Sequence, residues 1–230
     1  MGIFYTSFEG SDFFGKLIFI MLFALSVISW TVLIRKILLI KAVKAKGAEA
    51  LSSLNSQDLS ALLFAIDPSI NENPFSRVLY SISSKTSQIL HKNHHFQEER
   101  KTYLSQRDMQ AIDDFSSMTI YQEIKDLGSD LFILSTVVTL APFLGILGTV
   151  WGILICLGEL QKSGGGSNSI VLEGLSTALA TTVLGLLIAI PALISYNYLK
   201  NAIATIGSDM EGLSVKVLSE LELQYRTVEA

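Results

Sequence analysis

The sequence predicts an all-α integral membrane protein. It has three transmembrane helices, two long helices that extend into the cytoplasm, and a large helical cytoplasmic loop. The first observation is composition: 50% of the 230 residues are hydrophobic, only 17% are charged, and the mean hydropathy is +0.46. The second is the presence of three long stretches without charge, and the third is a helical period in the polar segments between and after them. A purely soluble domain is excluded by these values.

The three uncharged stretches are residues 17–34, 131–158 and 174–199. A bilayer core about 30 Å thick is crossed by about 20 helical residues, because lipid offers no partner to an unpaired backbone amide. We therefore expect each stretch to be a transmembrane helix. The second and third stretches are longer than the bilayer requires, so we expect them to project beyond the hydrocarbon.

Basic residues predict the direction of the chain. Arg35, Lys36, Lys41, Lys44 and Lys46 crowd the positions just after the first uncharged stretch, whereas residues 1–16 hold one lysine and two acids. The positive-inside rule then places the amino terminus outside, and the first stretch is a retained anchor. Residues 1–16 and 159–173 are short outer segments, residues 35–130 form the cytoplasmic loop, and residues 200–230 form a cytoplasmic helical tail.

The loop carries two helical patterns. Asn73 before Pro74 predicts a helix start, followed by an apolar face at three- and four-residue steps formed by Phe75, Leu79, Ile82, Thr86 and Ile89. A second run from about residue 96 places Leu104, Ala111, Phe115 and Met118 on one side. Because no proline interrupts that run, we expect its helix to continue unbroken into the second transmembrane stretch.

The carboxy-terminal tail has a near-heptad apolar pattern. Its positions, here called the tail seam, are Leu199, Ile203, Ile206, Met210, Leu213, Val217 and Leu221. Such spacing predicts that the third transmembrane helix runs on into the cytoplasm and packs against a neighbouring helix. Gly207 and Gly212 lie off the seam.

Small and hydroxyl residues gather in the second and third transmembrane stretches. In the second, Gly145, Gly148 and Gly152 surround Thr149, and Gly148 with Gly152 forms a GxxxG pair that permits close helix packing. In the third, one narrow face holds Ala178, Thr182, Gly185, Ala189 and Ala192, with Thr177 and Thr181 beside it. These faces suit either packing against another helix or lining a narrow passage.

Two prolines lie inside the predicted transmembrane helices. Pro142 and Pro191 each leave the carbonyl one turn earlier without its amide partner. We expect static kinks in which the hydroxyls of Thr139 and Ser195 bond the freed carbonyls.

Several functions are excluded or disfavoured. A net charge of −4 provides no basic field for nucleic acid. The single cysteine, Cys156, is expected to be a packed apolar residue. His91, His94 and His95 have metal-compatible spacing but lie in a polar stretch, so a solvated face is the expectation and no metal or other cofactor is predicted. No set of nucleophile, base and orienting residue is found, and we expect no enzymatic activity.

Two segments resemble a known family. Residues 141–152 (APFLGILGTVWG) and 178–192 (ALATTVLGLLIAIPA) are similar to the paired signature of the TolQ/ExbB/MotA energy-transducing membrane proteins. The order of spans, the large loop and the helical tail also match over nearly the whole chain. The short amino-terminal segment and the length resemble the TolQ branch most and the ExbB branch next.

The resemblance implies a homo-oligomeric, pentameric ring in a bacterial inner membrane, with a periplasmic amino terminus and a cytoplasmic carboxy terminus. The ring would surround a TolR/ExbD-type single-span partner that bears a membrane aspartate, and a TolA/TonB-type protein would carry the work across the periplasm. The implied function is proton-motive-force-driven work at the outer membrane, of the Tol-Pal type that maintains the envelope and serves division. An ExbB-like subunit for TonB-dependent uptake and a passive membrane scaffold are the alternatives.

The resemblance also assigns residues. Thr149 and Thr182 match the family's two proton-path threonines, and hydroxyls both donate and accept. Thr177 stands where the family usually has glutamate, so Glu173, four residues earlier, is the candidate substitute at the path's mouth, with Thr181 nearby. The transmembrane stretches themselves contain no Asp, Glu, Lys, Arg or His, so any titrating group must come from a partner.

Overall fold

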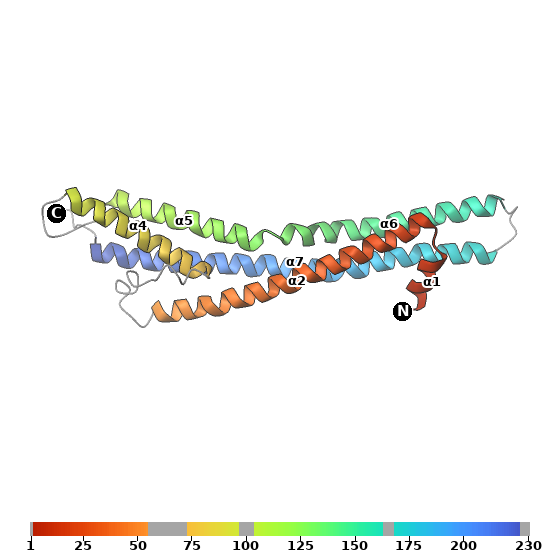
Figure 1. Cartoon of the computed structure of the whole chain (residues 1–230), viewed down its shortest axis with the longest axis horizontal. Helices are drawn as coiled ribbons and strands as arrows, with labels where there is room; N and C mark the ends of the chain where they lie inside the picture. The colour runs from red at the N-terminus through yellow and green to blue at the C-terminus, as the bar shows by residue number, and fades with distance from the viewer. Residues whose placement is uncertain (1, 55–72, 97–103, 163–167, 226–230) are drawn as a thin grey trace. The chain divides into compact units, whose positions relative to one another are not determined.

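A computed structural model describes residues 2–54, 73–96, 104–162 and 168–225. Within these ranges, the side chains of residues 3, 6, 49–54, 94–96, 162, 168–171 and 173 fall outside the description. The described elements are helices: α1 (Gly2–Gly10), α2 (Phe13–Leu54), α4 (Pro74–Phe96), α5 (Gln106–Gly128), α6 (Leu131–Lys162) and α7 (Asn168–Tyr225) (Figure 1). The predicted all-α class is confirmed, with α2 and α7 as the two longest helices.

Three of these helices are long and apolar enough to cross a bilayer, within Phe13–Ala48, Leu131–Gln161 and Gly174–Tyr225. The chain is therefore a multi-pass membrane protein. Where the membrane boundaries fall along each helix, and which end faces outward, stay predictions.

The chain divides into two compact units. Residues 1–37 and 130–200 form one, here called the membrane unit, and residues 38–129 and 201–230 form the other, here called the polar unit. Helices α2 and α7 contribute to both. Each unit has its own packing and is described by itself.

The core of the membrane unit lies where α2, α6 and α7 meet (Figure 1). Ile18 and Leu22 of α2 contact a strip of small and branched residues on the other two helices. These partners are Val137, Ala141 and Leu144 of α6, and Ile188, Ala189 and Ala192 of α7. Three alanines in this strip let the helices approach closely. In a membrane such close van der Waals packing stabilises helix contacts, because lipid is as apolar as the side chains and adds no hydrophobic driving force.

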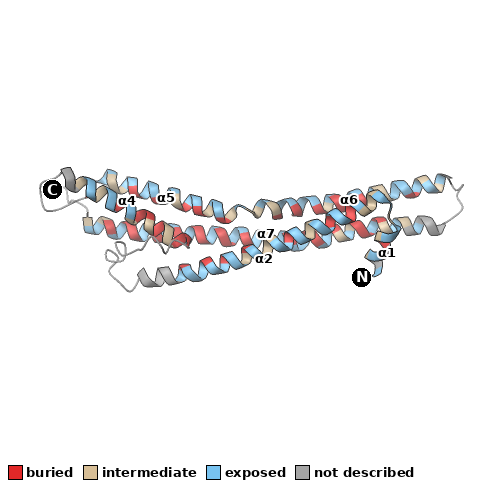
Figure 2. Cartoon of the chain, in the orientation of Figure 1, coloured by how far each residue is buried: buried red, intermediate tan, exposed pale blue. Residues whose placement is uncertain are grey.

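Much of the ribbon of the membrane unit is coloured as exposed (Figure 2). Its exposed residues include large apolar ones: Phe23 of α2, Phe143 of α6 and Ile194 of α7 are each about two thirds exposed, at 70%, 67% and 66%. Soluble monomers rarely expose apolar patches of this extent. Lipid tails or other protein subunits must therefore cover these faces.

An ion pair lies at one end of the membrane unit. Lys36 of α2 is buried, and its Nζ lies 3.2 Å from a carboxylate oxygen of Asp130, which immediately precedes α6. A buried ammonium is costly unless it is paired. The pair therefore fixes α2 against the start of α6.

The expectation that one helix runs unbroken into the second transmembrane stretch was wrong. Helix α5 ends at Gly128, and α6 begins at Leu131 after a turn formed by Ser129 and Asp130. The amides of Ser129 and Ile133 bond the carbonyls of Asp126 and Asp130, in three-residue steps. A break needs no proline when a glycine and two residues that favour local turns follow one another.

In the polar unit, α4 begins where its sequence predicts. The Asn73 side chain accepts a hydrogen bond from the Phe75 amide at 3.4 Å, and Pro74 occupies the first helical position. Of the predicted apolar face, Phe75, Leu79, Ile82 and Thr86 are buried, and Ile89 is half-buried. The start of α4 and its packing face are thus confirmed.

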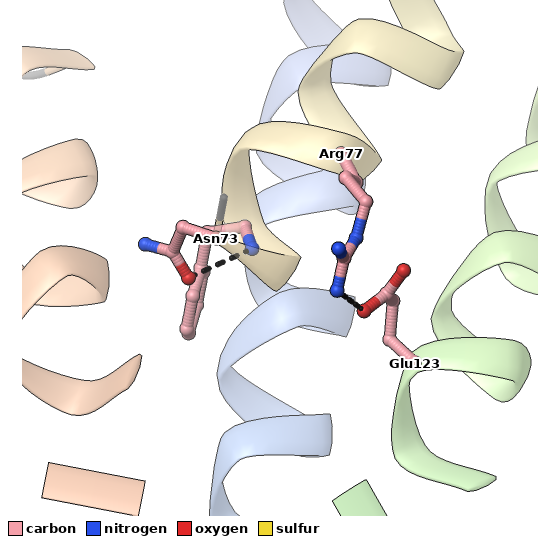
Figure 3. A network of polar contacts seen from close by, with 4 residues as sticks. Asn73, Arg77 and Glu123 are labelled. Carbon is pink, nitrogen blue, oxygen red and sulfur yellow. Dashed lines mark hydrogen bonds and ion pairs between the residues drawn. The ribbon is translucent and has the colours of Figure 1, made fainter. Parts of the chain in front are cut away.

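An ion pair links α4 to α5. Arg77 points toward Glu123, and its guanidinium donates to a carboxylate oxygen of Glu123, which is itself buried (Figure 3). A charge-assisted hydrogen bond of this kind offsets the cost of taking the carboxylate out of water. It also aligns the two helices.

The buried face of α5 differs from the predicted one. Ala111, Phe115 and Met118 are exposed, although Leu104 ahead of the helix is buried as expected. The buried residues of the helix are Ile112, Ser116, Ile120, Glu123 and Leu127. Apolar spacing missed this face because two of its members are polar and have polar partners: Glu123 bonds Arg77, and Ser116 lies 2.7 Å, hydroxyl to hydroxyl, from Ser214 of α7.

The tail seam on α7 is confirmed. All seven of its residues are at most 4% exposed, and α7 runs without a break from Asn168 to Tyr225. Gly207 has a packing role off the seam: a methyl group added there would lie 2.7 Å from the Ile124 side chain of α5. Gly212 is exposed and has open space around it.

Helix α5 begins with a capping box that carries a pH dependence. The Ser105 side chain accepts from the Asp108 backbone amide. The Asp108 carboxylate accepts from the Ser105 backbone amide, from the Ser105 hydroxyl and from the Asn93 side-chain amide. Partial burial raises the pKa of Asp108, but these hydrogen bonds outweigh it, and the pKa lies below its usual value.

A lowered native pKa gives stability that is present above the pKa of the unfolded chain, about 3.9, and is lost as the pH falls through the native value. We expect the melting temperature of the wild-type protein in detergent to fall between about pH 5 and pH 3, and to fall less in Asp108→Asn. Asp113→Asn, an exposed change on the same helix, is the matched control. An unaltered pH profile in Asp108→Asn would contradict this role.

Candidate functional site

Helices α6 and α7 cross at close range in the membrane unit. A methyl group added at Gly145 would lie 2.9 Å from the Thr182 Cα, and one at Gly152 would lie 2.7 Å from the Ala178 Cβ. From the other side, a methyl group at Gly185 would lie 2.6 Å from the Ala141 carbonyl oxygen. The backbones thus touch at positions where only hydrogen fits, and Gly148 likewise lies against Thr181.

The crossing brings Thr149 and Thr182 together; they are called the threonine pair below. Their hydroxyl oxygens lie 3.0 Å apart. The Thr182 hydroxyl also donates to the Gly145 carbonyl at 2.9 Å, so both of its hydrogen bonds reach across to α6. The Thr149 hydroxyl has own-helix acceptors in the carbonyls of Gly145, at 3.1 Å, and Ile146, at 2.8 Å.

Thr181 reaches the same carbonyl. Its hydroxyl belongs to a buried residue and donates to the Ala178 carbonyl at 2.7 Å and to the Gly145 carbonyl at 3.2 Å. Three hydroxyls therefore converge on the Gly145 carbonyl oxygen. A carbonyl oxygen only accepts, so it can hold these hydroxyls in place but cannot pass a proton between them.

Exposed apolar side chains flank the threonine pair along α6 and α7. Thr149 and Thr182 are each partly exposed. Their neighbours one turn before and after are the exposed side chains Ile146, Ile153, Leu179 and Leu186. The core cluster with α2 includes Leu144 and Ile188, about a third of a turn away around each helix, and also Ala189, two turns after Thr182 on the same face of α7. The pair is thus the polar spot on an otherwise apolar outward face.

The hydroxyls predicted to bond the carbonyls freed by Pro142 and Pro191 bond other carbonyls. Both α6 and α7 continue through their prolines. The carbonyls freed one turn earlier belong to Val138 and Leu187. The Thr139 hydroxyl, however, donates to Ser135 and Thr136, and the Ser195 hydroxyl donates to Pro191 itself. The expected repair was wrong because a hydroxyl in a helix reaches most easily the carbonyl three or four residues before its own.

A cavity of about 410 Å³ lies in the membrane unit beside the α1–α2 connection; it is called the amino-terminal cavity. Its lining residues are Gly10, Ser11, Asp12, Gly15, Gly148, Trp151, Gly152, Ile155, Cys156, Glu159, Gly174, Thr177, Ala178 and Thr181. Thr177 and Thr181 thus border this cavity, whereas Thr149 and Thr182 are not among its lining. The structure separates the predicted path threonines into two places.

Asp12 and Trp151 of the cavity lining are bonded to each other. The Trp151 Nε1 donates to an Asp12 carboxylate oxygen at 2.9 Å, and its ring contacts Phe14, centroid to centroid, at 4.4 Å. Sequence reasoning missed this link because the two residues are 139 positions apart and no local pattern joins them. Cys156 is buried at the cavity wall, as a packed residue should be.

Two sequence predictions fall outside the described side chains. The first concerns the side chain of Glu173, the candidate substitute for the family's glutamate. The second concerns the side chains of His94 and His95. His91, the remaining histidine of that trio, is exposed on α4. The predicted mouth of the path therefore rests, among described side chains, on Thr177, which is half-buried.

Proteins of known name are similar to this chain in sequence. The chain is similar to the ExbB biopolymer transport protein of Helicobacter pylori (41% identity over 44% of this chain and 66% of that protein) and to ExbB of Pseudomonas putida (26% over 92% and 61%). It thus spans less than two thirds of the length of these two proteins. It is also similar to the Tol-Pal system protein TolQ of Haemophilus influenzae (26% over 84% and 82%).

A family model matches residues 82–212, more than half of the chain, and includes the α6–α7 crossing with its threonine pair. The resemblance drawn from residues 141–152 and 178–192 is thereby confirmed. The spans of this chain combine glycines that admit close backbone contact with bonded hydroxyls and carry no charge. The chain belongs to the MotA/TolQ/ExbB proton channel family.

Proposed function

We propose that this protein is the ring-forming subunit of an ion-driven motor in a bacterial inner membrane. Its role is to convert proton flow into mechanical work and not to catalyse covalent chemistry. Energy is passed to the outer membrane through a periplasm-spanning partner of the TolA/TonB type. The family, the multi-pass fold and the similarity to proteins named ExbB and TolQ support this role.

The observation that carries the proposal is the threonine pair. Thr149 and Thr182 bond each other at 3.0 Å at a partly exposed position, in spans without Asp, Glu, Lys, Arg or His. The Thr182 hydroxyl makes both of its bonds to the neighbouring helix, so it is held at the surface of the crossing. A hydroxyl in this position can accept a hydrogen bond from a carboxyl and donate one to a carboxylate.

The titrating acid comes from a partner. An uncharged lining cannot relay protons by itself, so a TolR/ExbD-type single-span protein with a membrane aspartate faces the threonine pair. Moving one charge through 100 mV yields about 2.3 kcal/mol. Several protons are therefore used for each large mechanical event.

The apolar outward faces support a ring. In a homo-oligomer, expected to be a pentamer, the partly exposed threonine pair of α6 and α7 faces the centre, and exposed apolar side chains of α2 face lipid. The amino terminus lies in the periplasm and the carboxy terminus in the cytoplasm, as the basic residues after the first span favour. A TolQ-like role in envelope maintenance is favoured by the TolQ relative, which matches most of both chains. An ExbB-like role in uptake is the second candidate, supported by the ExbB relatives.

An uncoupler separates the motor from a passive scaffold. Cells that depend on this protein are tested for leakage of periplasmic protein while the proton gradient is lowered stepwise. We expect leakage to rise as the gradient falls, while the complex with the single-span partner, recovered by pull-down, stays intact. A scaffold would protect the envelope equally with and without the gradient, and that result would overturn the proposal.

A further inference from the structure

Helix α2 becomes strongly basic just beyond the first uncharged stretch. That stretch ends at Ile34, and the next acidic residue along the chain is Glu49. Between these two positions lie five basic residues and no acidic one, all on a single continuous helix. This part of α2 is therefore a concentration of positive charge in a chain whose net charge is −4.

One face of this basic segment packs inside the polar unit. Ile40 and Val43 are only 3% and 6% exposed. Gly47 lies against α4, where an added methyl group would be 2.5 Å from the Phe75 ring. Positions i, i+3 and i+7 share one face of a helix, so these three residues determine which side of α2 points inward. The opposite side of α2 faces away from that packing.

Three exposed residues form what is called the leucine–lysine ridge below: Leu38, Lys41 and Lys44. They follow one another at three-residue steps, so each lies beside the next on the helix surface, and Leu38 is 63% exposed. Lys36, in contrast, is buried and paired with Asp130. Within the described part of the chain, Lys41 and Lys44 have no acidic partner. Two neighbouring lysines without an acid favour an anionic partner.

The ridge lies at the distance from the uncharged stretch where lipid headgroups are expected. At about 1.5 Å per residue, Leu38, Lys41 and Lys44 are about 6, 10 and 15 Å beyond Ile34 along the helix. The headgroup layer is about 5–8 Å thick on each side of the hydrocarbon. A lysine stem can lie along apolar surface while its ammonium reaches this layer. Leucine beside lysine is also typical of helix surfaces that rest at the membrane interface.

We propose that the leucine–lysine ridge binds anionic phospholipids of the leaflet from which α2 emerges after Ile34. Lys41 and Lys44 contact the phosphate and headgroup oxygens, and Leu38 contacts the upper part of the acyl chains. Because residues 17–34 extend only about 27 Å and the hydrocarbon core is about 30 Å thick, the uncharged stretch alone does not hold α2 at one depth. The bound lipids fix that depth.

The lipid preference is measured by native mass spectrometry on the full-length protein in a neutral detergent. Phosphatidylglycerol and phosphatidylcholine with the same acyl chains are added in equal amounts. Each lysine near an anionic lipid surface strengthens binding by about fivefold. We therefore expect the first bound lipid to be phosphatidylglycerol about tenfold more often than phosphatidylcholine. In Lys41→Gln combined with Lys44→Gln, the ratio should fall to about twofold or less.

A second double variant controls for net charge. Lys92→Gln combined with Arg107→Gln also removes two positive charges from exposed positions of the polar unit, but on α4 and α5. If the ridge is the binding site, this variant should keep the lipid preference of the wild-type protein. An equal loss of preference in both double variants would mean that the preference depends on the charge of the whole protein.

A fluorescent label tests whether lipid covers the ridge. Leu38→Cys is combined with Cys156→Ser, so that the label has a single position, and the protein is reconstituted in vesicles of phosphatidylglycerol and phosphatidylcholine. A nitroxide on the lipid headgroup should quench the label more strongly than one deep in the acyl chain. At Val215→Cys, which is 66% exposed and about 24 Å beyond Leu199 along α7, neither nitroxide should quench.

Three results would overturn the proposal. The first is a preference for phosphatidylglycerol that is as strong in the ridge variant as in the wild-type protein, and the second is the equal loss described above. The third is a label at position 38 that no lipid nitroxide quenches, which would mean that a second copy of this chain or another protein covers the ridge. Neither measurement needs a proton gradient or a partner, so the outcome does not depend on the motor function proposed above.

Discussion

Replacement of Thr182 by valine should abolish ion-driven work while the protein still assembles. Valine keeps the shape of threonine but removes the hydroxyl that bonds Thr149 and the Gly145 carbonyl across the helix crossing. A positioned proton-transfer group typically contributes about 10²-fold or more to a rate. We expect energy-dependent activity to fall by about 100-fold, measured as restoration of envelope integrity in a deletion strain, and Thr149→Ala to behave alike.

Thr139→Val is the matched control, since the Thr139 hydroxyl bonds only carbonyls of its own helix among the bonds found for it. This variant should retain activity. Loss of one intramolecular hydrogen bond costs about 1 kcal/mol, so pull-down of the single-span partner should be unchanged in all three variants. Full activity of Thr182→Val and Thr149→Ala would rule out the assigned role of the threonine pair.

The second large effect is expected at Gly185. An alanine methyl group there would lie 2.6 Å from the Ala141 carbonyl oxygen and 3.3 Å from the Gly145 Cα, so backbone and not a flexible side chain would have to move. Overpacking of this kind costs about 1–3 kcal/mol. We expect Gly185→Ala to lower the melting temperature of the purified oligomer by several degrees and to weaken its function by separating α6 from α7.

Gly158→Ala tests whether the loss comes from the crossing itself. Gly158 also lies inside a helix of the membrane unit, but nothing is found within 4 Å of the position that its Cβ would occupy. Alanine favours the helix over glycine by about 0.5–1 kcal/mol, so this variant should melt at the same temperature or slightly higher. Equal destabilisation by the two substitutions would show that close packing at Gly185 is not the cause.

Periodicity and charge predicted the elements that are continuous and apolar. The tail seam from Leu199 to Leu221 and the face from Phe75 to Thr86 are buried as the spacing requires. The three transmembrane helices follow from uncharged length alone. In these elements the structure follows from the burial of apolar residues, and such residues recur at regular spacing or in long runs in the sequence.

The misses occur where polar partners decide the outcome. The buried face of α5 differs from the predicted one because Ser116 is bonded to Ser214 and Glu123 to Arg77. A search for apolar spacing does not detect polar pairs of this kind. The start of α5 did have a local signal, since Ser105 and Asp108 stand three residues apart as in a capping box. The bond between Asp12 and Trp151 had none, because folding alone brings together residues so distant in sequence.

The three hydroxyls that share the Gly145 carbonyl affect how readily one of them can change its hydrogen-bond partner. Its carbonyl has two lone pairs, and the helical amide of Thr149 already uses one, so three hydroxyls compete for what is left. Thr149 and Thr181 can turn to carbonyls on their own helices, but Thr182 has no such option among the bonds found for it. Two donors are thus always in surplus, and redirecting one of them toward an arriving carboxylate breaks no bond that another hydroxyl cannot immediately replace.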